Sequence, residues 1–259
     1  MIEVKNLVQH YGVRPVLKDV SFSVNRGELM AVMGPNGMGK STLLSTMAGL
    51  LTPRKGQVVI DGKRRRNSEE EELAIRKITY FLPTDPWLPQ QLTGREFLLA
   101  VGEVYDVETE RLFEHIDRAL ILFNLCELEN ATIASYSTGQ KKKIALSAAL
   151  ISEAKVMILD EPFSGGLDPS GLLAARKVLK SLAEREDVTI CMATPVPEFV
   201  EELAHRVVVL KDGEVLACES IPDLRKRAQC EGSMTEVMEQ LISPQTLENV
   251  AYYFERNRT

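Results

Sequence analysis

The stretch LMAVMGPNGMGKST (residues 29–42) decides the fold of this chain. Residues 29–33 are apolar throughout, as expected for a strand that is covered on both faces. The next residues fit the pattern Gly-x4-Gly-Lys-Ser, in which backbone N–H groups and a helix N-terminus hold phosphate. A segment of helical character follows over residues 43–48. A buried strand, a glycine-rich loop and a helix in this order predict a nucleotide-binding α/β domain.

The glycine-rich loop supplies most of the predicted nucleotide contacts. Glycine lets the backbone turn tightly and approach phosphate oxygens without an intervening side chain. We expect Lys40 to reach the β- and γ-phosphates of ATP and the Ser41 hydroxyl to ligate Mg²⁺. An ordinary glycine-rich turn is the alternative, and the strand and helix on either side argue against it. The predicted contact residues are Gly34, Pro35, Asn36, Gly37, Met38, Gly39, Lys40, Ser41 and Thr42.

A second motif, VMILDEP (residues 156–162), places two carboxylates at the end of an apolar strand. Ligands of α/β proteins bind at this edge of the sheet. We expect Asp160 to hold Mg²⁺ through its water shell, and Glu161 to orient and deprotonate the attacking water. A solvated strand end would explain one such acid, but the pair together with the phosphate loop predicts an ATPase. Glu161 and Lys40 are its predicted catalytic residues.

Composition and charge restrict the classes of protein that fit. The chain has 259 residues, of which 26 % are charged and 44 % apolar, as in ordinary globular proteins. A net charge of −6 argues against a protein that coats nucleic acid, so no nucleic-acid partner is expected. The four cysteines form no CxxC pair, which favours reduced thiols in the cytoplasm. No apolar run is long enough to span a bilayer, and no signal peptide is expected.

The remaining patterns alternate between strands and helices. Period-2 alternation at residues 2–4 and 20–24 predicts half-buried strands. Apolar runs at residues 188–193 and 207–210, separated by helical segments, predict further parallel strands. Residues 93–152 have helical spacing, and an apolar stripe is predicted to be core (Phe113, Ile116, Leu120, Phe123). The basic run 63–66, followed by glutamates 69–72, predicts a solvated loop and the start of a helix.

Over residues 1 to about 220 the sequence resembles the ATP-binding-cassette (ABC) family of ATPases, most of all the subunits that serve ABC-2-type exporters. Three further features carry the resemblance. Residues 136–140 (YSTGQ) stand at the family's signature position, and residues 166–168 (GLD) stand where its D-loop belongs. Tyr11, followed by Gly12, matches the aromatic residue that stacks on adenine in the family.

The resemblance implies a fold, a mechanism and partners. The implied fold is α/β: a P-loop NTPase core with a mostly parallel sheet, an N-terminal antiparallel β-subdomain and an inserted α-helical subdomain at about residues 84–152. Residues 221–259 would form a C-terminal helical extension to this ABC ATPase domain. Two such chains, as a homodimer or heterodimer, would bind two ATP molecules between them and drive a separate integral membrane permease from the cytoplasmic face. Signature and D-loop residues would contact the nucleotide of the other subunit, namely Ser137, Thr138, Gly139, Gln140 and Asp168.

Three departures from the family pattern concern the chemistry. Thr84 stands where the glutamine of the Q-loop belongs, and Pro195 stands where the switch histidine belongs. Proline has neither a side-chain donor nor an N–H, so a γ-phosphate contact from this position is lost. Thr138 replaces the first glycine of the signature. Because a lost pre-organised charge stabiliser costs on the order of 10²-fold in rate, we expect intact ATP binding with slow hydrolysis.

Two other functions compete with the transporter subunit. An ATP-dependent regulatory protein of the same fold, without transport, would tolerate the losses at Thr84 and Pro195. A small-molecule kinase would share the phosphate loop but would not explain residues 137–140 followed by the acid pair. The proline-rich loop 84–92, with Trp87, lies where the family contacts its permease. Packing of Trp87 into the local core is the alternative for that residue.

Overall fold

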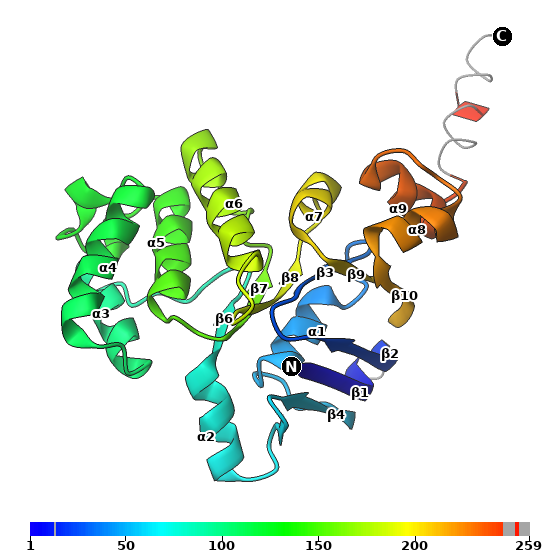
Figure 1. Ribbon diagram of the computed structural model, residues 1–259, viewed down its shortest axis with the longest axis horizontal. Helices are drawn as coiled ribbons and strands as arrows, with labels where there is room; N and C mark the ends of the chain where they lie inside the picture. Colours follow the sequence, from blue (N-terminus) through cyan, green and yellow to red (C-terminus); the bar gives the residue numbers. More distant parts are fainter. Residues whose placement is uncertain (13, 246–251, 254–259) are drawn as a thin grey trace.

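Two β-sheets and a layer of helices organise the chain (Figure 1). The computed structural model describes residues 1–12, 14–245 and 252–253. The described strands are β1 (Ile2–Tyr11), β2 (Arg14–Val24), β3 (Leu29–Met33), β4 (Lys55–Ile60), β5 (Lys63–Arg64), β6 (Thr79–Leu82), β7 (Val156–Asp160), β8 (Thr189–Ala193), β9 (Arg206–Lys211) and β10 (Glu214–Ser220). The helices are α1 (Lys40–Met47), α2 (Glu69–Ile78), α3 (Gly94–Val104), α4 (Thr109–Leu122), α5 (Thr138–Ile151), α6 (Pro169–Ala183), α7 (Pro197–Leu203), α8 (Ile221–Ala228) and α9 (Met234–Ile242), with single 3-10 turns at Cys126–Leu128 and Ile133–Ser135.

The larger sheet has six strands in the order β10-β9-β3-β8-β7-β6. All neighbouring strands are parallel except β10, which pairs antiparallel with β9. Every residue of β3, β7 and β8 is buried, because helices or the second sheet cover both faces. Their apolar runs therefore identified them correctly, whereas β10, which is half-exposed, was not predicted.

The smaller sheet is antiparallel, with the order β2-β1-β4-β5. Its inner face and one face of the larger sheet form a common core with α1, which contributes Leu43, Leu44 and Met47. Figure 1 shows this small sheet on the side of the parallel sheet opposite to α5 and α6. The helix that follows the phosphate loop is thus held between two sheets. The mostly parallel sheet and the N-terminal antiparallel sheet are confirmed.

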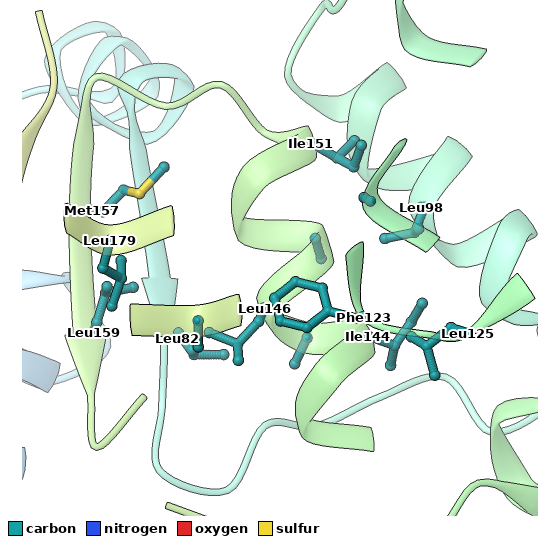
Figure 2. Close-up of a cluster of buried hydrophobic side chains, with 14 of the residues drawn as sticks. Leu82, Leu98, Phe123, Leu125, Ile144, Leu146, Ile151, Met157, Leu159 and Leu179 are labelled. Carbon is teal, nitrogen blue, oxygen red and sulfur yellow. The ribbon is translucent and has the colours of Figure 1, made fainter. Parts of the chain in front are cut away.

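Helices α3, α4 and α5 come between β6 and β7 in the sequence and pack with α6 on the other face of the parallel sheet. Figure 2 shows Phe123 inserted among Leu146, Ile144 and neighbouring apolar side chains. The prediction of the core stripe is wrong for one residue, because the side chain of Phe113 is 47 % exposed. The buried face of α4 is formed by Leu112, Ile116, Ala119 and Leu120, and Phe113 lies at the edge of that face.

The basic run before α2 also differs from the prediction. Helix α2 begins as expected, with the Ser68 hydroxyl accepting from the N–H of Glu71. Arg65, however, is buried and not solvated. Its guanidinium pairs with Glu72 at 2.8 Å and donates to the carbonyl of Met47 at 3.0 Å. A carbonyl at the end of α1 needs a donor from outside its own helix, and Arg65 supplies it.

The C-terminal helices α8 and α9 pack against one end of the larger sheet. Their core consists of Leu224, Met234 and Val237 together with Val207 and Val209 of β9. The final part of the predicted extension, residues 246–251 and 254–259, lies outside the described residues. Within the described part of the chain, no helix combines the length and the apolar character that a membrane span requires.

Candidate nucleotide site

The glycine-rich loop joins β3 to α1, as the sequence predicts, and its conformation requires glycine. Gly34 and Gly39 have φ angles of 147° and 96°, which side chains rarely adopt. A Cβ atom on Gly34 would lie 2.2 Å from the carbonyl oxygen of Leu210. Gly39 is the N-cap of α1 and brings no side chain to the first N–H groups of that helix. The main chain here can therefore donate to an anion.

Lys40 is only 7 % exposed and is folded back over this loop. Its ammonium donates to the carbonyl oxygens of Gly34 at 2.7 Å and Pro35 at 3.1 Å. Burial lowers the pKa of Lys40, and the charges of Glu161 and Asp160 oppose that shift. The loop thus already holds a cation that a phosphate group can attract.

The two acids lie at the end of β7, where the sequence places them. Asp160 is buried, and its Oδ1 has no hydrogen-bond partner among the described residues. A buried acceptor without a donor is costly, and oxygen ligands of this kind suit Mg²⁺ or its bound water. Ser41 lies in the first turn of α1, which packs against β7. The donor set at this position therefore fits the predicted metal.

Glu161 follows directly and is held in an unusual backbone conformation. Its φ angle is 48°, in the left-handed region that costs a non-glycine residue about 1–2 kcal/mol. Its N–H donates to the carbonyl of Ala193 at 2.9 Å, and its own carbonyl accepts from the N–H and hydroxyl of Ser164. These contacts fix the direction in which the half-buried carboxylate leaves the sheet.

The position where the family has its switch histidine, Pro195, follows the neighbouring strand β8. Ala193, the last residue of β8, pairs with Asp160 of β7, so the residues that follow it are beside the acid pair. Thr194 is buried, and its hydroxyl accepts from the N–H of Val196 at 3.2 Å. Pro195 is exposed and presents no donor.

The signature residues begin α5. Ser137 is its N-cap, and Ser137 and Gln140 form a capping box in which each side chain accepts from the backbone N–H of the other. A Cβ on Gly139 would lie 2.4 Å from the carbonyl oxygen of Gly166, so this turn rests on the D-loop. Thr138 is exposed. Packing within the chain thus requires glycine at position 139, whereas position 138 accommodates a side chain.

Asp168 of the D-loop is held by contacts inside this chain. Its carboxylate caps α6 by accepting from the N–H of Gly171 at 2.8 Å, and it pairs with Lys143 of α5 at 3.0 Å. Both contacts lower the pKa of Asp168, the Lys143 hydrogen bond most of all. Sequence reasoning missed Lys143 and its neighbour Lys142. The signal was a run of lysines that continues directly into the apolar sequence of a buried helix.

Tyr11 is the last residue of β1, opposite Arg14 of β2, and its side chain lies outside the described part of the structure. Its role in stacking on adenine therefore stays a prediction. A pocket of about 480 Å³ lies close by, between Arg14 and Val16 at the start of β2 and Met38 of the phosphate loop. No motif in the sequence marks these two β2 residues as lining a site.

The fold and this site define a nucleotide-binding ATPase of the phosphate-loop class. The family model for ABC transporters matches residues 17–164 of the chain. The ABC transporter ATP-binding protein YxlF of Bacillus subtilis is 30 % identical over 93 % of this chain and 78 % of its own length. The SkfA peptide export ATP-binding protein SkfE of the same organism is 30 % identical over 88 % of this chain and 93 % of its own.

Solved structures agree with these relatives. The structure of an ATP-binding subunit of an ABC transporter superposes with a TM-score of 0.84 at 29 % identity, covering 93 % of this chain and 99 % of the other. A dimeric, post-hydrolysis state of the ATP-binding cassette MJ0796, bound to ADP and Pi, gives a TM-score of 0.75 at 27 % identity, with 85 % and 99 % covered. The chain belongs to the ABC transporter family, as an ATP-binding subunit with ATPase activity.

Proposed function

We propose that this chain hydrolyses ATP for an exporter, working as a dimer on the cytoplasmic face of a membrane and driving a separate integral membrane permease. The peptide-export relative SkfE and the dimeric MJ0796 cassette support this proposal. The observation that carries it is the buried Oδ1 of Asp160, which has no hydrogen-bond partner in the described part of the chain and lies on the strand next to the phosphate-loop helix. The same relatives favour a transporter subunit over a regulatory protein without transport.

Residues 34–42 bind the triphosphate in this proposal. Their N–H groups donate to the phosphate oxygens, and Lys40 exchanges its carbonyl partners for the β- and γ-phosphates. Ser41 and Asp160 would hold Mg²⁺, which when bound neutralises phosphate charge. Tyr11 would stack on adenine, as the family resemblance implies.

Glu161 is the proposed general base. Its backbone is fixed at the end of β7, and its charge acts on the Lys40 ammonium of the phosphate loop, which supports a place for the carboxylate near the γ-phosphate. Thr84 and Pro195 offer no side chain equivalent to the family's glutamine and histidine, so we propose slow turnover. Ser137, Thr138, Gly139, Gln140 and Asp168 would complete the site of the second subunit.

The domain division proposed here follows the packing. Residues 1–220 form the ABC ATPase domain, with the helical subdomain inserted at about residues 84–152 and sharing one core with α6 and the parallel sheet. Residues 221–259 form the extension, whose described helices α8 and α9 pack on the edge of the sheet next to β9 and β10.

The proposal is tested with purified protein and a Glu161→Gln variant. We expect both to bind a fluorescent ATP analogue in the presence of Mg²⁺, and only the wild type to release phosphate when its membrane partner is present. Equal phosphate release from both proteins would contradict the role of Glu161. Co-purification with a multi-span membrane protein from detergent extracts supports the transporter, whereas a partner-free soluble dimer would support a regulatory protein.

A further inference from the structure

A buried lysine links the nucleotide site to the loop that follows β6. Lys142 lies in the second turn of α5 and is 2 % exposed. Its ammonium donates to the carbonyl oxygen of Thr84 at 3.2 Å. Its stem runs beside the D-loop, because a Cβ on Gly165 would lie 3.5 Å from its Cδ. One side chain from the signature helix therefore lies between two loops of the candidate site.

Three acidic groups lie within electrostatic range of this ammonium. Asp160 and Glu161 of the site and Asp85 of the loop all favour its charged form, while burial lowers the pKa of Lys142 to about 8. The group therefore carries a positive charge at neutral pH. An ammonium has three protons to donate, and the bond to Thr84 uses one of them. A buried cation is costly unless charges compensate it, so the acids at the end of β7 help to hold Lys142 in this place.

We propose that Lys142 couples occupancy of the nucleotide site to the position of the loop 83–92, through its charge. This coupling rests on the proposed function. The acids at β7 attract Lys142 while the metal position is empty, and Lys142 in turn holds the backbone of Thr84. When Asp160 also interacts with Mg²⁺, its attraction for Lys142 weakens. The interaction of Lys142 with the loop therefore differs between the empty site and the site that holds Mg²⁺-ATP. Such a difference is what a ligand needs in order to shift a conformational equilibrium.

The residue at position 84 explains why a lysine of α5 would make this link. Thr84 has no amide side chain that could extend into the site, so the contact runs from its main-chain carbonyl to Lys142 instead. The next lysine, Lys143, is engaged elsewhere, with Asp168 of the D-loop. The preceding lysine, Lys141, is only half-buried and provides a matched control.

Trp87 makes the coupling measurable. It is the single tryptophan of the chain, lies three residues after Thr84 in the same loop, and is 85 % exposed. Acrylamide, a neutral quencher, therefore reports on this loop through tryptophan fluorescence alone. We expect Mg²⁺-ATP to change the quenching constant of the wild type, and ATP in the presence of EDTA to leave it unchanged.

Variants separate charge from packing. Lys142→Gln can still donate a hydrogen bond but carries no charge, so we expect it to bind ATP and to lose the quenching response. Lys142→Arg keeps the charge and should keep the response, as should the control Lys141→Gln. The coupling would be overturned if Lys142→Gln showed the full change in the quenching constant. It would also be overturned if ATP changed the quenching constant of the wild type equally with Mg²⁺ and with EDTA. The second comparison uses the wild type alone and does not depend on the folding of a variant.

The coupling and the proposed function fail in different ways. Binding of the fluorescent ATP analogue is measured on the same samples. A wild-type protein that binds ATP with Mg²⁺ but shows no change at Trp87 overturns the coupling alone. A wild-type protein that binds no ATP overturns the proposed function, and the coupling with it.

Discussion

Replacing Gly139 by alanine probes the contact on which the signature turn depends. The added methyl would lie 2.4 Å from the carbonyl oxygen of Gly166, where real Cβ contacts stay above 3.0 Å, so one backbone segment must retreat by about 0.6 Å. The obstacle is main chain, and the D-loop continues into Asp168, which caps α6 and pairs with Lys143. Overpacking of this kind costs about 1–3 kcal/mol. For a chain of this size that corresponds to a fall in Tm of roughly 2–4 °C per kcal/mol.

The assay is urea unfolding of Gly139→Ala beside Thr138→Ala, whose side chain is exposed at the first position of α5. We expect Thr138→Ala to unfold like the wild type and Gly139→Ala to lose about 2 kcal/mol. ATP binding should survive, because neither Gly139 nor Gly166 belongs to the phosphate loop 34–42, while hydrolysis by the dimer should fall. A Gly139→Ala protein as stable as the wild type would refute the reasoning, as would a loss of ATP binding in step with stability.

Three other changes test separate parts of the structure. Pro195→His should raise phosphate release on the order of 10²-fold if the missing histidine limits turnover, and an unchanged rate would contradict that. Phe123→Ala should cost about 3–5 kcal/mol in urea unfolding, and Phe113→Ala about 0.5 kcal/mol or less; equal losses would contradict the buried face assigned to α4. Asp168→Ala should cost at least about 1 kcal/mol at neutral pH, through loss of the α6 cap and of the ion pair with buried Lys143. Because Asp168 has a lowered pKa in the folded state, this stabilisation is present above its ordinary range and disappears in acid, where wild type and variant should unfold alike.

Sequence patterns identified the central strands and the phosphate loop because each depends on local composition. A strand covered on both faces, such as β7, must be apolar throughout, and a loop with φ angles like those of Gly34 and Gly39 must use glycine. The positions that sequence reasoning missed depend on tertiary contacts. Phe113 fits the helical spacing of α4, and only the packing of its neighbours leaves it 47 % exposed. Arg65 belongs to a basic run, and only the fold brings Met47 and Glu72 to its guanidinium.

Helix α5 shows why the sequence predicted the location of the candidate site but not all the contacts that hold it together. Its N-cap, Ser137, is recognisable from the sequence, whereas Lys142 and Lys143 resemble a solvated charge run until the fold buries them at 2 % and 7 % exposure. Buried lysines are tolerated only where acceptors and opposite charges compensate them. Here those partners come from two loops that are far apart in the sequence, at Thr84 and at Asp168. The free-energy cost of burying Lys142 and Lys143 is therefore offset only while the loop after β6 and the D-loop stay in contact with them. A helix built in this way cannot shift without changing the loop after β6 and the D-loop together, which is the property that a nucleotide-driven transporter subunit needs.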